Sequence, residues 1–263
     1  MSTPPSPSAP PPAASPLSVA PPAPRHPPRR ADCPWCGSRR LRPRQPATAP
    51  AARCALVVCR DCRHAFRNPP PGPDHPDGTL VRAGAALRHL LAARALLGRC
   101  PEPESWLDVD TGDARFPHTA RRFFPYTSFD GLDPTHRVLR ARAAERVEEA
   151  YVGRLTDPHL TARLRARYDV VSVLRPERSP DPRAELHAAL RALRPGGHLL
   201  LDAVDPRVLL AHPPGTRPTA RLRAELREHG CVPLTPAGSR RIIARTAPAR
   251  PRTAPAQPRS TSA

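Results

Sequence analysis

Short apolar runs alternate with segments of helical periodicity over much of this 263-residue sequence. The runs read SWLDV, YTSFDGLD, YDVVSVL and HLLLDAV, and the helical segments follow Arg115, span 135–150 and 181–193, and resume near Thr219. Strands that alternate with helices predict a parallel sheet, because each crossover helix packs on one face of the sheet. The pattern therefore predicts an α/β domain over residues 104–245, with helices on both faces of its sheet.

Before this domain, residues 79–97 (TLVRAGAALRHLLAARALL) carry Leu and Ala at helical spacing and are followed by Gly98. They predict an amphipathic helix.

Residues 1–30 and 246–263 lack any periodic pattern. Both segments are rich in Pro and Ala, together with Ser or Arg, and the chain as a whole has 41 prolines. Such segments cannot bury enough apolar surface to offset the entropy of ordering, so we expect two disordered, Pro-rich tails.

Four of the seven cysteines form two C-x-x-C pairs, Cys33 with Cys36 and Cys59 with Cys62, separated by 22 residues. This spacing is typical of a zinc ribbon, in which two turns joined by a hairpin direct four thiolates at one tetrahedral ion. Four protein ligands complete the coordination sphere, so the zinc is expected to be structural. Disulfides are the alternative, and the lack of a secretory signal disfavours them. We assign the ribbon to residues 31–70 and a linker with the amphipathic helix to residues 71–103.

The net charge of +19 comes entirely from arginine, since the chain contains no lysine. Residues 104–245 carry 24 arginines and 18 acids, which leaves +13 of the charge in the flanks. Codon bias in a GC-rich genome explains much of this arginine, and aromatic residues at 4% offer few platforms for stacking bases. We expect only weak nucleic-acid contact through the flanks. Proline interrupts every apolar run near the N-terminus, which predicts a cytoplasmic protein without membrane contact.

Four stretches occur in a characteristic order: WLDVDTGDARF at 106–116, FDGLDPT at 129–135, YDVVSVL at 168–174 and LRPGGHLLLDAV at 193–204. Together they resemble the successive motifs of class I S-adenosylmethionine-dependent methyltransferases. The segments CPWCGS and CRDCRHAFRNP resemble the zinc ribbon that precedes the core in one subgroup of that family. The resemblance implies a Rossmann-like methyltransferase sheet, S-adenosylmethionine as cofactor, and methyl transfer to an unidentified acceptor.

The resemblance also implies a cofactor site. A loop after the first strand would pass under the methionine moiety, an acid at the end of the second strand would bind the ribose, and residues 155–157 would close over adenine. A carboxylate at a strand end suits ribose hydroxyls for its own chemical reasons, although the same acid could merely cap the following helix. The implied positions are Asp108, Asp110, Gly112, Asp133, Leu155 and Thr156.

The loop departs from the family pattern D-x-G-x-G-x-G, because this chain reads D-V-D-T-G-D-A and lacks two glycines. Asp110 stands at a glycine position, where positive φ costs about 1 kcal/mol. Its carboxylate would repel the methionine carboxylate by about 1 to 4 kcal/mol, or attract the cationic groups if it faces them. In RPERSPDP, Arg178 replaces a family histidine and cannot act as a base, so the catalytic residues stay unknown. A catalytically degenerate scaffold and a nucleic-acid-associated zinc-ribbon module are the alternatives to an enzyme.

Overall fold

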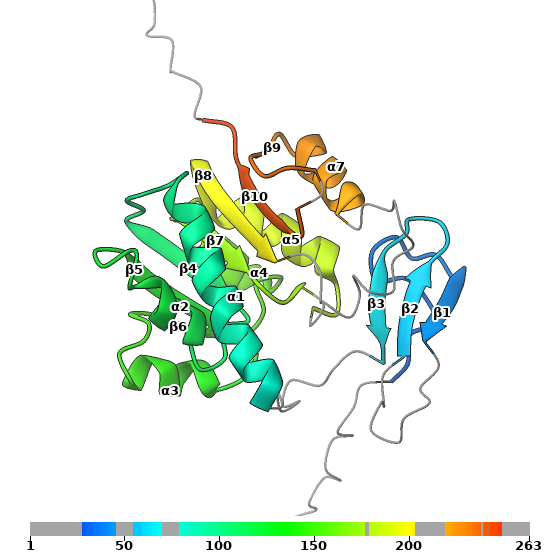
Figure 1. Ribbon diagram of the computed structural model, residues 1–263, viewed down its shortest axis with the longest axis horizontal. Coiled ribbons are helices and arrows are strands. Elements are labelled where there is room, and N and C mark those ends of the chain that lie inside the picture. Colours follow the sequence, from blue (N-terminus) through cyan, green and yellow to red (C-terminus); the bar gives the residue numbers. More distant parts are fainter. Residues whose placement is uncertain are drawn as a thin grey trace, which may run out of the picture.

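The computed structural model describes residues 28–45, 55–69, 79–176, 179–202, 219–237 and 239–248. These residues form a three-stranded sheet and a larger α/β domain, which Figure 1 shows beside each other. Nearly all of the predicted tails, residues 1–27 and 249–263, lie outside the described residues.

The small sheet is antiparallel, with strand order β1-β2-β3. Its strands are β1 (Leu41–Gln45), β2 (Ala55–Cys59) and β3 (Ala65–Asn68). The first C-x-x-C pair precedes β1, and the second spans the end of β2 and the turn that leads to β3. The antiparallel strands therefore bring two cysteine pairs that are distant in sequence to one end of the small sheet.

The large sheet has the strand order β6-β5-β4-β7-β8-β10-β9. Its strands are β4 (Ser105–Val109), β5 (Ser128–Asp133), β6 (Ala150–Val152), β7 (Tyr168–Val173), β8 (Leu193–Asp202), β9 (Val232–Pro233) and β10 (Arg241–Arg245). The first five strands in this order are parallel, which confirms the predicted α/β fold. The sheet is nevertheless mixed, because β10 runs antiparallel to β8 and to β9.

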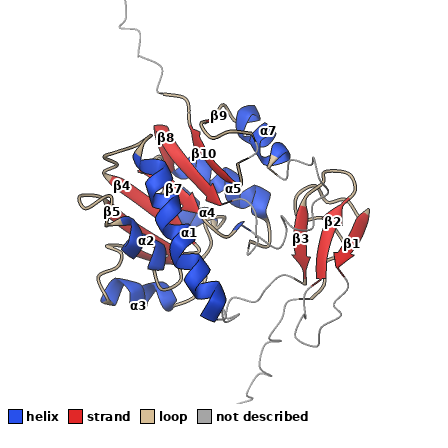
Figure 2. Cartoon of the chain, viewed as in Figure 1, coloured by secondary structure: helices blue, strands red, loops and turns tan. Residues whose placement is uncertain are grey.

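Helices pack on both faces of this sheet, as predicted (Figure 2). They are α1 (Thr79–Leu97), α2 (Arg115–Ala120), α3 (Arg137–Ala143), α4 (Pro158–Arg163), α5 (Pro182–Ala192) and α7 (Ala220–Glu228). The helix expected over residues 135–150 is shorter than predicted, because α3 ends at Ala143 and the chain enters β6 at Ala150.

Alternating strand residues separate the core into two layers, because successive side chains of a strand point to opposite faces. One set packs with α1 and α2, and the other packs with α5 and α7. The first set includes Trp106, Phe129, Val170, Leu200 and Ile243, and the second includes Leu107, Leu132, Val171, Leu199 and Ile242.

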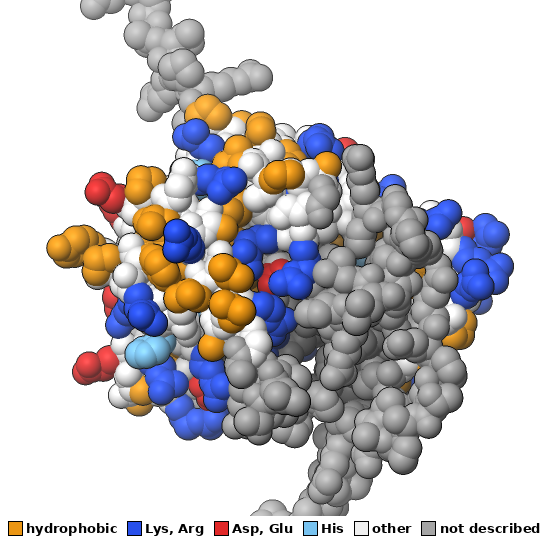
Figure 3. All heavy atoms as spheres, in the orientation of Figure 1, with side chains coloured by type: hydrophobic (Ala, Val, Ile, Leu, Met, Phe, Trp, Pro, Cys, Tyr) orange, Lys and Arg blue, Asp and Glu red, His pale blue; other side chains and the backbone are white. Residues whose placement is uncertain are grey.

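Helix α1 occupies the predicted residues but is only partly amphipathic. Ala93 and Leu96 are fully buried, whereas Leu87 and Leu91 on its outer face are 58% and 46% exposed. Figure 3 shows apolar side chains exposed over this helix. Among the described residues, no helix is long and apolar enough to cross a membrane.

Two glycines provide a test of the packing in the large sheet. A Cβ at Gly131 in β5 would lie 2.9 Å from Thr111 Cγ2 and 3.1 Å from Val138 Cγ2, whereas a Cβ at Gly84 in α1 would meet nothing within 4 Å. We expect Gly131→Ala to destabilise the domain by about 1 to 3 kcal/mol through overpacking. Gly84→Ala should instead stabilise it by about 0.5 to 1 kcal/mol, because alanine favours a helix interior.

Urea unfolding, followed by circular dichroism at helical wavelengths, measures both effects in the full chain. Equal midpoints for the wild type and Gly131→Ala would contradict the close packing of β5 against α3.

Candidate functional site

The large sheet contains one reversal of strand order among its parallel strands. From β4 the chain moves outward to β5 and β6, and it then returns to β7 on the other side of β4. The loops that leave β4 and β7 therefore diverge, and a crevice opens beyond the carboxyl ends of these strands. The loop of residues 110–114 lies at this crevice.

This loop has a left-handed backbone at every second residue. The φ angles are +56° at Asp110, +57° at Gly112 and +52° at Ala114. These are the three positions at which the pattern D-x-G-x-G-x-G has glycine. The loop thus has positive φ at all three glycine positions, although an L side chain in this region costs roughly 1 to 2 kcal/mol.

Asp133, at the end of β5, holds the loop in place. Its Oδ2 accepts a hydrogen bond from the Gly112 amide at 2.7 Å, and its Oδ1 accepts one from the Thr135 amide at 2.9 Å. Asp133 is 4% exposed, whereas the residue that caps α3 is His136. Asp133 therefore connects β5 to the loop after β4, and it does not occupy the N-cap position of α3.

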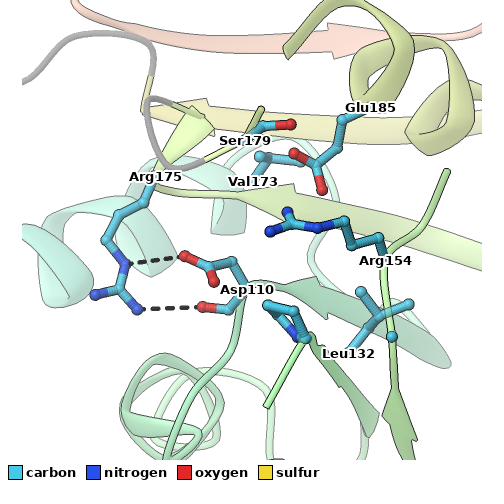
Figure 4. A pocket seen from close by; sticks show the side chains of 9 residues that line it. Asp110, Leu132, Arg154, Val173, Arg175, Ser179 and Glu185 are labelled. Carbon is cyan, nitrogen blue, oxygen red and sulfur yellow. Dashed lines mark hydrogen bonds and ion pairs between the residues drawn. The ribbon is translucent and has the colours of Figure 1, made fainter. Parts of the chain in front are cut away.

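The charge of Asp110 is offset by Arg175, the second residue after β7. Arg175 Nη2 donates to the backbone oxygen of Asp110 at 3.1 Å, and its Nε lies 3.7 Å from Asp110 Oδ2 (Figure 4). The two contacts join the loop after β4 to the loop after β7. Because the guanidinium lies beside the carboxylate, Asp110 presents a neutralised pair to the crevice instead of an isolated negative charge.

A shallow pocket opens at this edge of the sheet, with about 300 Å³ of space that includes open solvent. Two arginines and two acids face each other across it, as Figure 4 shows. Glu185 on α5 is 8% exposed, and burial raises the pKa of its carboxyl. The lining includes Asp110, Leu132, Gly153, Arg154, Arg175 and Glu185.

Asp108 does not line this pocket. Asp108 is 3% exposed, and its Oδ1 accepts a hydrogen bond from Ser172 Oγ at 2.6 Å. Ser172 Oγ in turn accepts a hydrogen bond from Trp106 Nε1 at 3.0 Å. Burial raises the pKa of the Asp108 carboxyl to about 7, against the opposing effect of the Ser172 hydrogen bond. This buried chain of hydrogen bonds joins β4 to β7 below the crevice.

The residues expected to close over adenine follow β6. Leu155 is fully buried, Thr156 is exposed, and the pocket is lined by Gly153 and Arg154 directly before them. Of the six predicted cofactor residues, Asp110 alone is in the pocket lining, whereas Gly112 and Asp133 are joined to each other beside it.

Arg137 on α3 covers the other side of the loop. Its guanidinium lies 3.4 Å from the place that a Cβ of Gly112 would take, and it binds Asp113 at 2.6 Å. These contacts with Arg137 hold the pKa of Asp113 below its usual range.

The sequence pattern did not indicate four residues at this site, namely Arg137, Arg154, Arg175 and Glu185. Residues 177 and 178, with the family's histidine position, lie outside the described residues.

The four ribbon cysteines converge. The Sγ atoms of Cys33 and Cys62 lie 3.6 Å apart, those of Cys36 and Cys59 lie 3.7 Å apart, and all four are within 4.8 Å of one another. Sulfurs placed about 2.3 Å from a tetrahedral ion are about 3.8 Å apart. The four thiols can therefore hold a metal ion with little movement.

The two cysteine turns have the same backbone shape. Gly37 follows the first pair with φ +73°, and Arg63 follows the second with φ +63°. The amide of each donates to the first cysteine of its pair, at 2.9 Å to Cys33 and 3.1 Å to Cys59. Arg63 thus takes a conformation that glycine adopts more readily.

The mixed sheet, with five parallel strands, one reversal of strand order and helices on both faces, is that of a Rossmann-like methyltransferase fold. The methyltransferase domain family matches residues 82–239, which is more than half of the chain. The chain therefore belongs to the methyltransferase domain family.

Solved structures with a similar fold include two methyltransferases. The 1,6-didemethyltoxoflavin-N1-methyltransferase of Burkholderia thailandensis is 16% identical, with a TM-score of 0.45 over 76% of this chain and 98% of that one. CalS10, an amino pentose methyltransferase of Micromonospora echinaspora, is 16% identical, with a TM-score of 0.47 over 66% of this chain and 99% of that one. A comparison with curated protein sequences finds no match.

Asp108 makes the stability of the domain depend on pH. Folding raises the pKa of this carboxyl from its ordinary value of 3.8 to about 7. Its contribution to the free energy of unfolding is therefore fully present below pH 3.8 and is lost as the pH rises through 7. Asp108→Asn cannot ionise, and its amide oxygen can still accept from Ser172. The variant should therefore match the wild type near pH 4 and exceed its unfolding free energy by up to about 4 kcal/mol at pH 8.

Urea unfolding at a series of pH values measures this difference. Ser105→Ala, which removes another side-chain hydrogen bond between β4 and β7, serves as a control, because the pKa of its partner Asp169 is lowered and any pH dependence should lie at acid pH and not near pH 7. A variant that is less stable than the wild type at pH 8 would show that β4 requires the ionised carboxylate.

Proposed function

We propose that this chain transfers a methyl group from S-adenosylmethionine to an acceptor, and that the cofactor binds in the pocket beyond β4, β5 and β7. The observation that carries the proposal is the pairing of opposite charges at the reversal of the sheet, in a chain of the methyltransferase domain family.

The charges suit the methionine moiety, which has a carboxylate, an ammonium group and a sulfonium. Arg175 and Arg154 supply the positive groups for the carboxylate, and Asp110 and Glu185 supply the negative groups. Two acids and two arginines balance each other, so a ligand with both signs of charge can bind without leaving a buried charge uncompensated.

The residues beside the pocket suit the adenosine moiety. Asp133 Oδ1 accepts both the amide and the hydroxyl of Thr135, whereas Oδ2 accepts the Gly112 amide and has a second lone pair for a ribose hydroxyl. Leu132 gives the pocket an apolar wall, and Leu155 with Thr156 follows directly after Arg154. We assign Asp133 to the ribose and Leu155 and Thr156 to the adenine side.

The bound cofactor would supply a methyl carbon activated by its sulfonium. The chain's own residues would hold the methionine and adenosine moieties in one orientation and exclude water from the crevice. Orientation alone supplies a large part of the rate for such a displacement, so no acid–base pair is required when the acceptor is already nucleophilic. No residue of this chain is assigned as a catalytic base.

The four ribbon cysteines are proposed to hold one structural zinc. Four thiolates match the preferences of zinc, and with four protein ligands the ion has no open position for catalysis. The ribbon and the α/β domain have separate sheets, so loss of the metal should leave the larger domain folded.

Calorimetric titration with S-adenosylmethionine and S-adenosylhomocysteine tests the cofactor proposal. Asp110→Gly removes a carboxylate that would repel the methionine carboxylate and compete with it for Arg175, so it should tighten both ligands about tenfold, or by about 1.4 kcal/mol. Ala114→Gly is the matched control, because it relieves the same backbone strain without changing a charge. Ala114 is buried against Ala141 and Val147, so the loss of its methyl offsets most of the relieved strain, and the variant should change the stability little and leave both affinities unchanged.

Comparing the affinities for S-adenosylmethionine and S-adenosylhomocysteine distinguishes which group of the cofactor the Asp110 carboxylate contacts. If Asp110→Gly weakens S-adenosylmethionine but not S-adenosylhomocysteine, the carboxylate contacts the sulfonium, which only the first ligand carries. If it weakens both equally, the carboxylate contacts the ammonium group. A wild-type chain that binds neither ligand would contradict the proposed function and favour the degenerate scaffold.

The zinc proposal predicts one zinc ion per chain that resists dialysis. Cys33→Ser should remove this ion, because three thiolates hold zinc less tightly than four, whereas Cys100→Ser should retain it. Elemental analysis of the purified variants measures the metal content. Full retention of zinc by Cys33→Ser would show that the ribbon is not the site.

A further inference from the structure

A second group of metal-ligating side chains, separate from the four cysteines, comes from α5 and α7, two helices that Figure 1 shows in the large domain. His187 comes from α5, while Glu225 and His229 are four residues apart at the end of α7. The potential ligand atoms of these three residues all lie within 4.8 Å of one another. Residues four apart on a helix share one face, so the two helices direct the three side chains at one point.

The hydrogen bonds of His229 leave one ring nitrogen available. Its Nδ1 lies 3.0 Å from the backbone oxygen of Glu225. A carbonyl oxygen can only accept, so Nδ1 carries the hydrogen and the lone pair of the neutral ring is on Nε2. A backbone carbonyl that orients an imidazole through its other nitrogen is a common arrangement around metal-bound histidine.

Glu225 and His187 complete the group. His187 Nε2 lies 2.8 Å from Glu225 Oε1, and the centroids of the two imidazole rings are 4.2 Å apart with an interplanar angle of 33°. The Glu225 side chain is 1% exposed. Two imidazoles at this separation, beside a carboxylate, can be held together by a cation that all three groups bind.

We propose that His187, Glu225 and His229 form a binding site for one divalent transition-metal ion, of which zinc is the best match. Two imidazoles and one carboxylate suit zinc, cobalt and nickel, and three protein ligands leave a coordination position for water. Binding displaces the hydrogen that His187 Nε2 shares with Glu225: in a neutral ring this proton moves to Nδ1, and in a protonated ring, where Nδ1 already carries a hydrogen, it passes to solvent.

Arg183 sets the affinity of this site. Its Nε donates to the same Glu225 oxygen at 2.7 Å, and its side chain is 44% exposed. The guanidinium competes with a metal ion for the carboxylate, so the site is weaker than the four-cysteine site and fills only when metal is supplied. Arg183 can turn toward solvent when the ion binds.

The site would connect α7 to the helix that carries a pocket residue. Glu185 lies two residues before His187 on α5 and lines the charged pocket. A metal ion shared by α5 and α7 would therefore hold Glu185 in a fixed position and raise the thermal stability of the α/β domain.

The test titrates zinc chloride, by calorimetry, into the full chain that already holds its ribbon zinc. We expect one further equivalent to bind. His187→Ala and His229→Ala should each weaken this second equivalent at least tenfold, whereas His118→Ala, at an exposed histidine of α2, should leave it unchanged. Identical isotherms for wild type and His229→Ala would overturn the site, and the three side chains would then serve only to join α5 to α7.

Two further measurements identify the ligands. Arg183→Gln should tighten the second equivalent at least threefold, because it removes the competing charge from Glu225. An unchanged affinity would overturn the role of Glu225. Cobalt bound at the second equivalent should show weak visible bands without the intense thiolate-to-cobalt charge transfer of a cysteine site. Appearance of that charge-transfer band would place the ion on thiols and overturn the proposal.

Discussion

The left-handed loop of residues 110–114 is the constraint on which the rest of the site depends. Each of its two non-glycine residues with positive φ costs roughly 1 to 2 kcal/mol, so the loop persists only because its surroundings hold it. Asp133 binds the Gly112 amide from β5, and Arg175 binds the Asp110 carbonyl from the loop after β7. The strands on either side of β4 thus fix the loop between them, and the crevice takes its shape from this fixation.

Much of the fold could be predicted from the sequence, because buried parallel strands give short apolar runs and their crossover helices give helical periodicity. The existence of β6 and the direction of β10 could not. Residues 150–152 are too few to show a period, and their pairing depends on β5, which lies 17 residues earlier in the chain. The apolar pattern of β10 indicates a strand but contains nothing about direction, which follows from the short return from α7 through β9.

The candidate site was harder to predict, since it brings together residues whose separation in sequence hides their contact. Asp110 and Arg175 are 65 residues apart, yet each follows one of two paired parallel strands, and parallel strands end at the same edge. An acid at a glycine position also calls for a nearby positive group. Together these two facts would have indicated Arg175. Glu185 had no such signal, because its place in the pocket depends on how α5 packs against the sheet.

The arginine content of the chain has a compositional explanation, and yet particular arginines are suited to their positions. Arg137 binds both oxygens of Asp113, through Nε at 3.3 Å and Nη2 at 2.6 Å, and Arg175 contacts both the backbone and the side chain of Asp110. A lysine has one charged nitrogen and could not make either pair of contacts with the same geometry. A genome that encodes arginine in place of lysine therefore supplies the planar, two-point group that this loop requires once two of its glycines are absent. The charge that seems excessive along the sequence is, at the crevice, matched by the carboxylates that face it.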